Sequence, residues 1–164
     1  MAILNPTQLS AEAQVIATET SQGANTAARI GQMFQDLVDS GIFAVKVSFS
    51  SAEILNGNSS PKSVVSAPGA GKLSFPAFIL WKYTFGTTPY ATNTTLRVRM
   101  GGTMMSLASL LTQTGNAYAL QPLLGGIFST DISNTAITID VQTGNPTGGD
   151  GTLDAYLIYN TISL

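Results

Sequence analysis

Apolar side chains occupy every second position of residues 73–85, and this alternation constrains the fold more than any other feature of the sequence. The series is Leu73, Phe75, Ala77, Ile79, Trp81, Tyr83 and Phe85. Because a β-strand sends alternate side chains to opposite faces, the pattern predicts a strand with one apolar face. The opposite face is polar at its ends but apolar in the middle, at Phe78 and Leu80. We therefore expect a central strand that is covered on both faces at its middle.

Similar period-two patterns recur from residue 42 onward, separated by turns rich in Gly, Asn and Pro. Strands are predicted at residues 42–49, 52–55, 62–66, 73–85, 94–100, 117–124, 133–141 and 153–162, and residues 104–111 fit either a strand or a helical turn. The lack of a helical pattern between these strands argues against a parallel α/β fold. The sequence predicts a mainly β fold, an antiparallel β-sandwich, and the number of strands favours a jelly roll.

One amphipathic helix is predicted before the strands, at residues 25–40. Its apolar stripe consists of Ala27, Ile30, Phe34, Leu37 and Val38. Asn25 or Thr26 can cap its first turn, and Gly41 can end it in the left-handed conformation. A helix of this length is marginal alone in water, so the stripe needs a partner: the chain's own sheet domain, sister chains or another protein. Residues 1–24 are predicted to form an extended or partly helical arm.

Charged residues make up 10% of the sequence, against about 25% in typical soluble domains. The net charge is −2, which gives no footprint for nucleic acid, and no charged residue occurs between Met100 and Thr130. Because interface cores are depleted in charge, this composition favours permanent self-assembly. The alternative is a monomer kept soluble by hydroxyl and amide groups. No apolar run is long enough for a membrane-spanning helix.

The chain has neither His nor Cys, so the commonest general base and the thiolate nucleophile are both missing. We expect no catalytic residue, no metal site and no cofactor. Asp150 and Asp154 could serve as the paired carboxylates of a glycosidase, or bind Ca²⁺ with Asp140 nearby, but a hairpin-turn role for Asp150 and an outward strand position for Asp154 are favoured. Tyr90 and two further tyrosines, Tyr118 and Tyr156, could stack on sugar rings, although packing in the core or an interface is the favoured role for each.

Three segments carry a resemblance to virion proteins of tailed bacteriophages. Residues 23–40 resemble a helix found in many such proteins, especially those of crAss-like phages of Bacteroides. Residues 67–72, which lead into the aromatic strand, and residues 149–159 are similar to small β-sandwich domains of phage head fibres and tail-fibre tips. The resemblance implies a homotrimeric sandwich of jelly-roll or TNF-like character, and a non-enzymatic head fibre or capsid decoration protein on the capsid surface, made in the host bacterial cytoplasm.

The same resemblance implies a division of the chain. Residues 1–41 would be an arm and helix that anchor the protein to the particle, with residues 1–40 contacting the major capsid protein or another virion protein. Residues 42–164 would be the displayed β-sandwich head. A tail-fibre tip or adaptor that binds carbohydrate or another receptor on the host surface is the alternative, and a hydrolase using the three aspartates is a more distant one.

Overall fold

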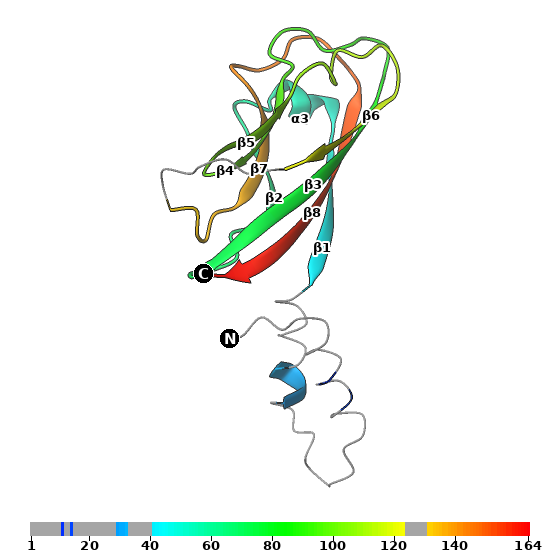
Figure 1. The fold of residues 1–164 in the computed structure, drawn as a ribbon. Helices are drawn as coiled ribbons and strands as arrows, with labels where there is room; N and C mark the ends of the chain where they lie inside the picture. Colours follow the sequence, from blue (N-terminus) through cyan, green and yellow to red (C-terminus); the bar gives the residue numbers. More distant parts are fainter. Residues whose placement is uncertain (1–10, 12–13, 15–28, 33–40, 124–130) are drawn as a thin grey trace.

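The computed structural model describes residues 11, 14, 29–32, 41–123 and 131–164. Within them, two antiparallel sheets of four strands each pack face to face (Figure 1). The predicted mainly β fold, an antiparallel β-sandwich, is confirmed. Among the described helical segments, none is long and apolar enough to span a membrane.

Sheet A has the strand order β1-β8-β3-β6, and sheet B has the order β2-β7-β4-β5. The strands are β1 (Ile42–Phe49), β2 (Lys62–Val65), β3 (Lys72–Thr84), β4 (Leu96–Met100), β5 (Gly102–Leu107), β6 (Ala117–Pro122), β7 (Ile137–Val141) and β8 (Thr152–Ser163). A five-residue helix, α3 (Ser51–Leu55), connects β1 to β2. The strand predictions therefore hold from β1 to β8, except at the segment that forms α3 and at residues 133–136, which form a turn and loop before β7.

The strand pairs are nested along the chain. The first strand pairs with the last, β2 with β7, β3 with β6, and β4 with β5. The innermost pair, β4 and β5, is joined by a tight turn in which Gly101 has φ of 70°, a conformation that glycine adopts without a Cβ clash. Further pairing of β3 with β8 and of β4 with β7 joins these pairs into the two four-stranded sheets. This nesting leaves β1 and β6 as the edges of sheet A.

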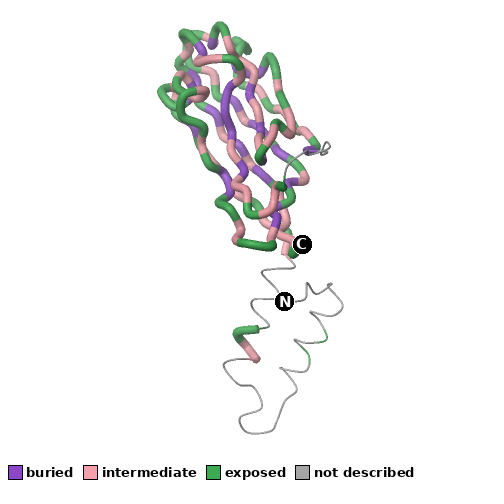
Figure 2. Tube along the Cα trace, turned by 90° about the vertical axis from the view of Figure 1, so that its left-hand side faces the viewer, coloured by how far each residue is buried: buried purple, intermediate pink, exposed green. Residues whose placement is uncertain are grey.

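The core lies between the two sheets, where buried residues (purple in Figure 2) run along the strands. Ile79, Trp81 and Tyr83 of β3 are fully buried, as their alternation predicts. They face residues of sheet B that are equally buried, such as Val98 and Ile137. Burial of large aromatic and aliphatic side chains is the main stabilising term for such a sandwich.

The predicted apolar face of β3 is wrong at Phe75. Between Pro76 and Phe78 the register of β3 against β8 shifts, and Ala77 has no register partner on β8. Such a bulge reverses the alternation of side chains on its two sides. Pro76 consequently lies buried, whereas Phe75 is 47% exposed and shares the outer face with Phe78.

The predicted strand at residues 52–55 is also wrong, because these residues form α3. The Ser50 hydroxyl accepts a hydrogen bond from the Glu53 N–H (3.3 Å), and the Glu53 carboxylate accepts one from the Ser50 N–H (2.8 Å). This reciprocal capping box satisfies two donors that a helix start leaves unpaired. Ile54 points into the core from the helix, which fixes its orientation.

Candidate interaction surface

The predicted anchoring helix lies mostly outside the described residues. Arg29–Gln32 are helical, in agreement with the prediction, and Ile30 is half-buried. The other four members of the predicted stripe lie outside the described residues: Ala27, Phe34, Leu37 and Val38. The anchoring role of this stripe, and the division into residues 1–41 and 42–164, stay predictions.

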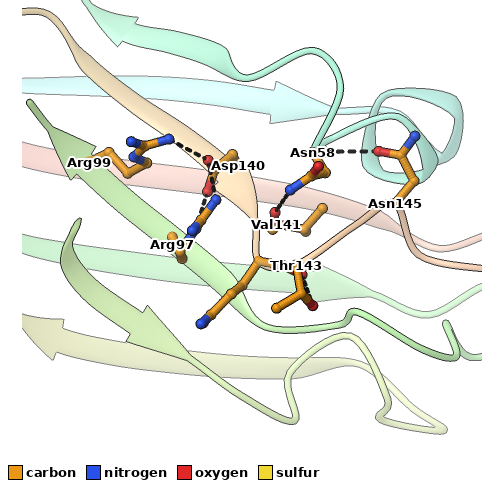
Figure 3. A network of polar contacts seen from close by, with 8 residues as sticks. Asn58, Arg97, Arg99, Asp140, Val141, Thr143 and Asn145 are labelled. Atoms are coloured by element: carbon orange, nitrogen blue, oxygen red, sulfur yellow. Dashed lines mark hydrogen bonds and ion pairs between the residues drawn. The ribbon is translucent and has the colours of Figure 1, made fainter. Parts of the chain in front are cut away.

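Asp140 on β7 is bound by two arginines of the neighbouring strand β4 (Figure 3). Arg97 donates to both carboxylate oxygens, from Nε and Nη2, at 2.7 Å each. Arg99 Nη1 donates a longer bond of 3.3 Å. The Asp140 side chain is 1% exposed, so its oxygens are enclosed by these partners. The arrangement is a structural ion pair on the outer side of sheet B, with no open carboxylate for acid–base chemistry.

Asp150 fastens the loop after β3 to the loop before β8. Its carboxylate accepts hydrogen bonds from the Thr87 hydroxyl (2.6 Å) and from the backbone N–H groups of Thr87 (2.8 Å) and Thr88 (2.9 Å). These donors, the Thr87 hydroxyl first, hold the pKa of Asp150 below its usual value. The carboxylate therefore accepts hydrogen bonds that stabilise a turn, which agrees with the turn role that the sequence favours for Asp150.

Asp154 lies on the outer face of sheet A, beside β1. It accepts a hydrogen bond from the Ser48 hydroxyl (2.6 Å) and pairs with Lys46 Nζ at 3.0 Å. The Ser48 bond, followed by the Lys46 bond, lowers the pKa of Asp154. Within the described part of the chain, acidic side chains form no group of three that could hold a metal ion.

A set of amide side chains ties loops together at one end of sheet B, also visible in Figure 3. The Asn145 side-chain oxygen accepts from the backbone N–H groups of Asn58 (3.0 Å) and Ser59 (3.1 Å). Asn58 Nδ2 in turn donates to the carbonyl of Val141 (2.7 Å), at the end of β7. The Asn-rich loops thus use their amides to satisfy backbone groups, a common role of Asn in turns.

Of the three tyrosines considered for sugar stacking, Tyr90 is enclosed in the core. It is 2% exposed, its hydroxyl donates to the carbonyl of Gly151 at 2.7 Å, and burial raises its pKa. The core role favoured for it is therefore confirmed. Tyr118 on β6 is 67% exposed. Tyr156 on β8 is half-buried, with Lys46 Nζ 5.5 Å from its ring centroid.

Tyr118 belongs to a broad apolar surface on the outer side of sheet A. We define the sheet A apolar face as the exposed large apolar residues of β3, β6 and β8: Phe75, Phe78, Leu80, Tyr118, Leu120 and Ile158. The strand register aligns them in rows across the sheet: Phe78 lies beside Ile158, and Leu80 lies beside Leu120. Individual exposures run from 37% at Leu80 to 67% at Tyr118 and Leu120.

Charged groups are confined to one end of this surface. Lys82 pairs in register with Asp154 on one side and Tyr118 on the other, and Lys46 lies across β8 from there. The hydrogen bond to Asp154 raises the pKa of Lys46, so this pair is charged at neutral pH. Beyond these charged groups the large exposed side chains are apolar, with the partly exposed Asn160 beside Phe75. In the sequence, the apolar middle of the second face of residues 73–85 already indicates this apolar surface, whereas the outward turn of Phe75 depends on the bulge.

A separate pocket of about 380 Å³ lies beside α3 and is lined by Phe49, Ala52, Glu53, Asn56, Ser60, Pro61 and Lys62. Its charged groups are engaged with one another and with the backbone. Lys62 Nζ forms an ion pair with Glu53, donates to the carbonyl of Ser48 at 2.7 Å, and lies 5.0 Å from the Phe49 ring centroid. The sheet A apolar face is thus the stronger candidate for a binding surface.

No known family matches the sequence, and no curated protein matches it. Two solved structures with partial likeness are the cyanophage Pam1 capsid asymmetric unit and the acidic stable capsid structure of Helicobacter pylori bacteriophage KHP30. The first is 19% identical, with a TM-score of 0.42 over 73% of this chain and 82% of that chain. The second is 16% identical, with a TM-score of 0.34 over 77% of this chain and 97% of that chain. At these TM-scores the likeness carries no argument about function.

Proposed function

We propose that this chain is a non-enzymatic structural component of a tailed-phage virion, a head fibre or capsid decoration protein that assembles as a homotrimer. The observation that carries the proposal is the sheet A apolar face, which the described residues leave exposed. Contiguous exposed apolar patches on soluble proteins mark interaction sites. Because only 10% of its residues are charged, the chain has few charged side chains to keep such an apolar face soluble. A partner that covers the face is therefore favoured.

The virion assignment is supported by the resemblance of residues 23–40 and 149–159 to phage structural proteins. The nested strand pairing supports a jelly roll within the sandwich class, an architecture that viral capsid domains use. The structural roles of Asp140, Asp150 and Asp154 favour a protein without catalysis, because each carboxylate is already bound by side-chain or backbone donors.

The anchor is tested by removing residues 1–40 and offering the tagged chain to assembling phage particles. We expect the full chain to be incorporated into purified particles and the shortened chain to stay in the unbound fraction. Circular dichroism of the shortened chain checks that the sandwich is intact. Incorporation of both forms at equal levels would overturn the anchoring role of residues 1–40, and incorporation of neither would overturn the virion assignment.

A tail-fibre tip or adaptor that binds host-surface carbohydrate is the second candidate. Tyr118 favours it, because an exposed aromatic ring beside Lys82 offers both a stacking surface and a polar contact. A glycan array distinguishes the two functions. The structural role predicts no specific binding, whereas a carbohydrate module predicts hits that Tyr118→Ala removes.

A further inference from the structure

We propose that the sheet A apolar face is buried against a second copy of this chain. The inference rests on the proposed function, since it assigns the surface through which the homotrimer would form. The proposed contact includes β3 and β8 as well as β6. The charge pattern of the sequence indicates only the part at β6, which lies in the uncharged segment between Met100 and Thr130.

The central strand of sheet A has the composition of a strand covered on both sides. Toward the core it presents Ile79, Trp81 and Tyr83, which are fully buried. Toward the outside it presents Phe78 and Leu80, yet the described residues leave these 47% and 37% exposed. Strands that face water on one side usually alternate apolar with polar residues. The missing cover on the outer side is therefore expected to come from another surface.

The size of the face matches a stable protein–protein contact. The strands of sheet A, β1, β8, β3 and β6, have 8, 12, 13 and 6 residues. With strands about 4.8 Å apart and a rise of about 3.3 Å per residue, their outer side covers roughly 620 Å². A specific interface buries about 600–1,000 Å² on each partner, so one copy laid over this side of the sheet supplies an area at the lower end of that range.

The charge distribution selects a copy of this chain as the occupant. Apart from Lys46, Lys82 and Asp154 at one end, the face offers no charge, so a strongly acidic or basic partner would leave its own charges unpaired. The chain's own surface meets the requirement, because no residue between Met100 and Thr130 is charged. The β6 edge of sheet A is likewise uncharged.

That edge is β6, which pairs with β3 on one side. Its sequence, Ala-Tyr-Ala-Leu-Gln-Pro, lacks the charged residues that monomeric proteins place on edge strands to prevent association, and its one guard is the terminal Pro122. Tyr118 and Leu120 project from it to the outer side at 67% exposure each. Among the described residues, neither this edge nor the adjoining face is covered, so the two form one continuous candidate surface for self-association.

The test compares the full purified chain with Leu120→Asp and with a matched control, Ser106→Asp. Ser106 is exposed on β5 in the other sheet, so both variants place one carboxylate on an exposed strand position. Analytical ultracentrifugation over a concentration series gives the dissociation constant. We expect the wild type and Ser106→Asp to be oligomeric at micromolar concentration, and Leu120→Asp to dissociate about 30-fold or more readily, the effect of losing one hot-spot side chain.

Fluorescence of the buried Trp81 verifies that each variant is folded, and Tyr118→Asp replaces Leu120→Asp if the latter is not. A wild-type chain that stays monomeric at roughly 100 μM, far above a micromolar dissociation constant, would overturn the inference and point to another protein or another segment of the chain as the cover. An oligomer that both face variants leave intact would overturn it as well. Because the measurement needs no phage, its result is separate from the particle-incorporation test of the proposed function.

Discussion

Asp140 is the one charged residue that is buried in the described part of the chain, and it depends on two unequal partners. Arg97 forms a two-pronged ion pair with it and is 19% exposed, whereas Arg99 makes a single 3.3 Å contact and is 39% exposed. Removing the main partner of a buried charge costs about 3–5 kcal/mol, but an exposed ion pair contributes about 1 kcal/mol or less.

We therefore expect Arg97→Ala to lower the free energy of unfolding by about 3 kcal/mol and Arg99→Ala by about 1 kcal/mol or less. Urea denaturation followed by Trp81 fluorescence measures both. The double variant Arg97→Met with Asp140→Leu is the control, because it removes the buried charge together with its partner and should recover much of the loss. Equal costs for the two arginines would contradict the unequal pairing.

Gly151 is required by the close approach of β3. A Cβ at this position would lie 2.6 Å from the Tyr83 hydroxyl oxygen and 2.8 Å from the carbonyl oxygen of Thr84. The second contact is with backbone, so Gly151→Ala forces the strand to move, and overpacking of this kind typically costs about 1–3 kcal/mol. Gly115→Ala is the matched control, since nothing lies within 4 Å of its Cβ. Thermal unfolding should show a lower midpoint for Gly151→Ala and little change for Gly115→Ala.

At the scale of elements, the regular alternation of Phe43, Val45 and Val47 predicted β1 correctly, and the same holds for β8. The bulge in β3 escapes such reasoning because apolar residues occupy both parities around it. The one-residue shift places Pro76 instead of Phe75 on the inner face. Because both residues are apolar, the alternation of apolar and polar residues in the sequence does not reveal the shift. Helix α3 has five residues, too few to establish a helical period, although Ser50 and Glu53 in the capping-box spacing could have indicated it.

The candidate surface was predictable in part for the same reasons. The apolar middle of the outer side of β3 is visible in the sequence at Phe78 and Leu80. The positions of Tyr118 and Leu120 depend on which parity of β6 faces inward, and Ala117 and Ala119 are the inward pair. Small inward and large outward residues reverse the usual expectation, because a large apolar residue is normally assigned to the core. Register, set by pairing with β3, is what decides the outcome.

The capping box of α3 stabilises the start of that helix. Ser50→Ala removes the acceptor for the Glu53 N–H at the helix start, and replacing an N-cap residue of this type costs about 1 kcal/mol. Ser60→Ala, in the exposed loop after the helix, is the control. Chemical denaturation should separate the two variants by that amount. If they unfold together, the cap contributes nothing that the packing of Ile54 does not already supply.

In the part of the chain that the structure describes, four carboxylates link stability to pH. Lys62 is the main cause that lowers the pKa of Glu53 to about 2, and hydrogen bonds lower those of Asp131, Asp150 and Asp154. Because these pKa values are depressed in the folded state, their stabilising contribution is present above the unfolded values of about 4 and is lost as the pH falls further. Urea midpoints should be level near neutrality and fall below about pH 4, less steeply in Asp150→Asn. A midpoint that rises on acidification would contradict this sign.

The two outer sides of the sandwich differ in character: sheet B carries the Arg97, Arg99 and Asp140 cluster, whereas sheet A carries an apolar face. If copies of the chain cover that face, folding is coupled to association, and the thermal midpoint must rise with protein concentration by mass action. Differential scanning calorimetry over a roughly hundredfold range of protein concentration should show this rise for the wild type and for Ser106→Asp. For Leu120→Asp the same rise should be displaced to about 30-fold higher protein concentration, since a buried charge in the contact weakens the association. A wild-type midpoint that does not move over this range would show that the sandwich folds and persists as a single chain, with its apolar face exposed or covered by its own residues.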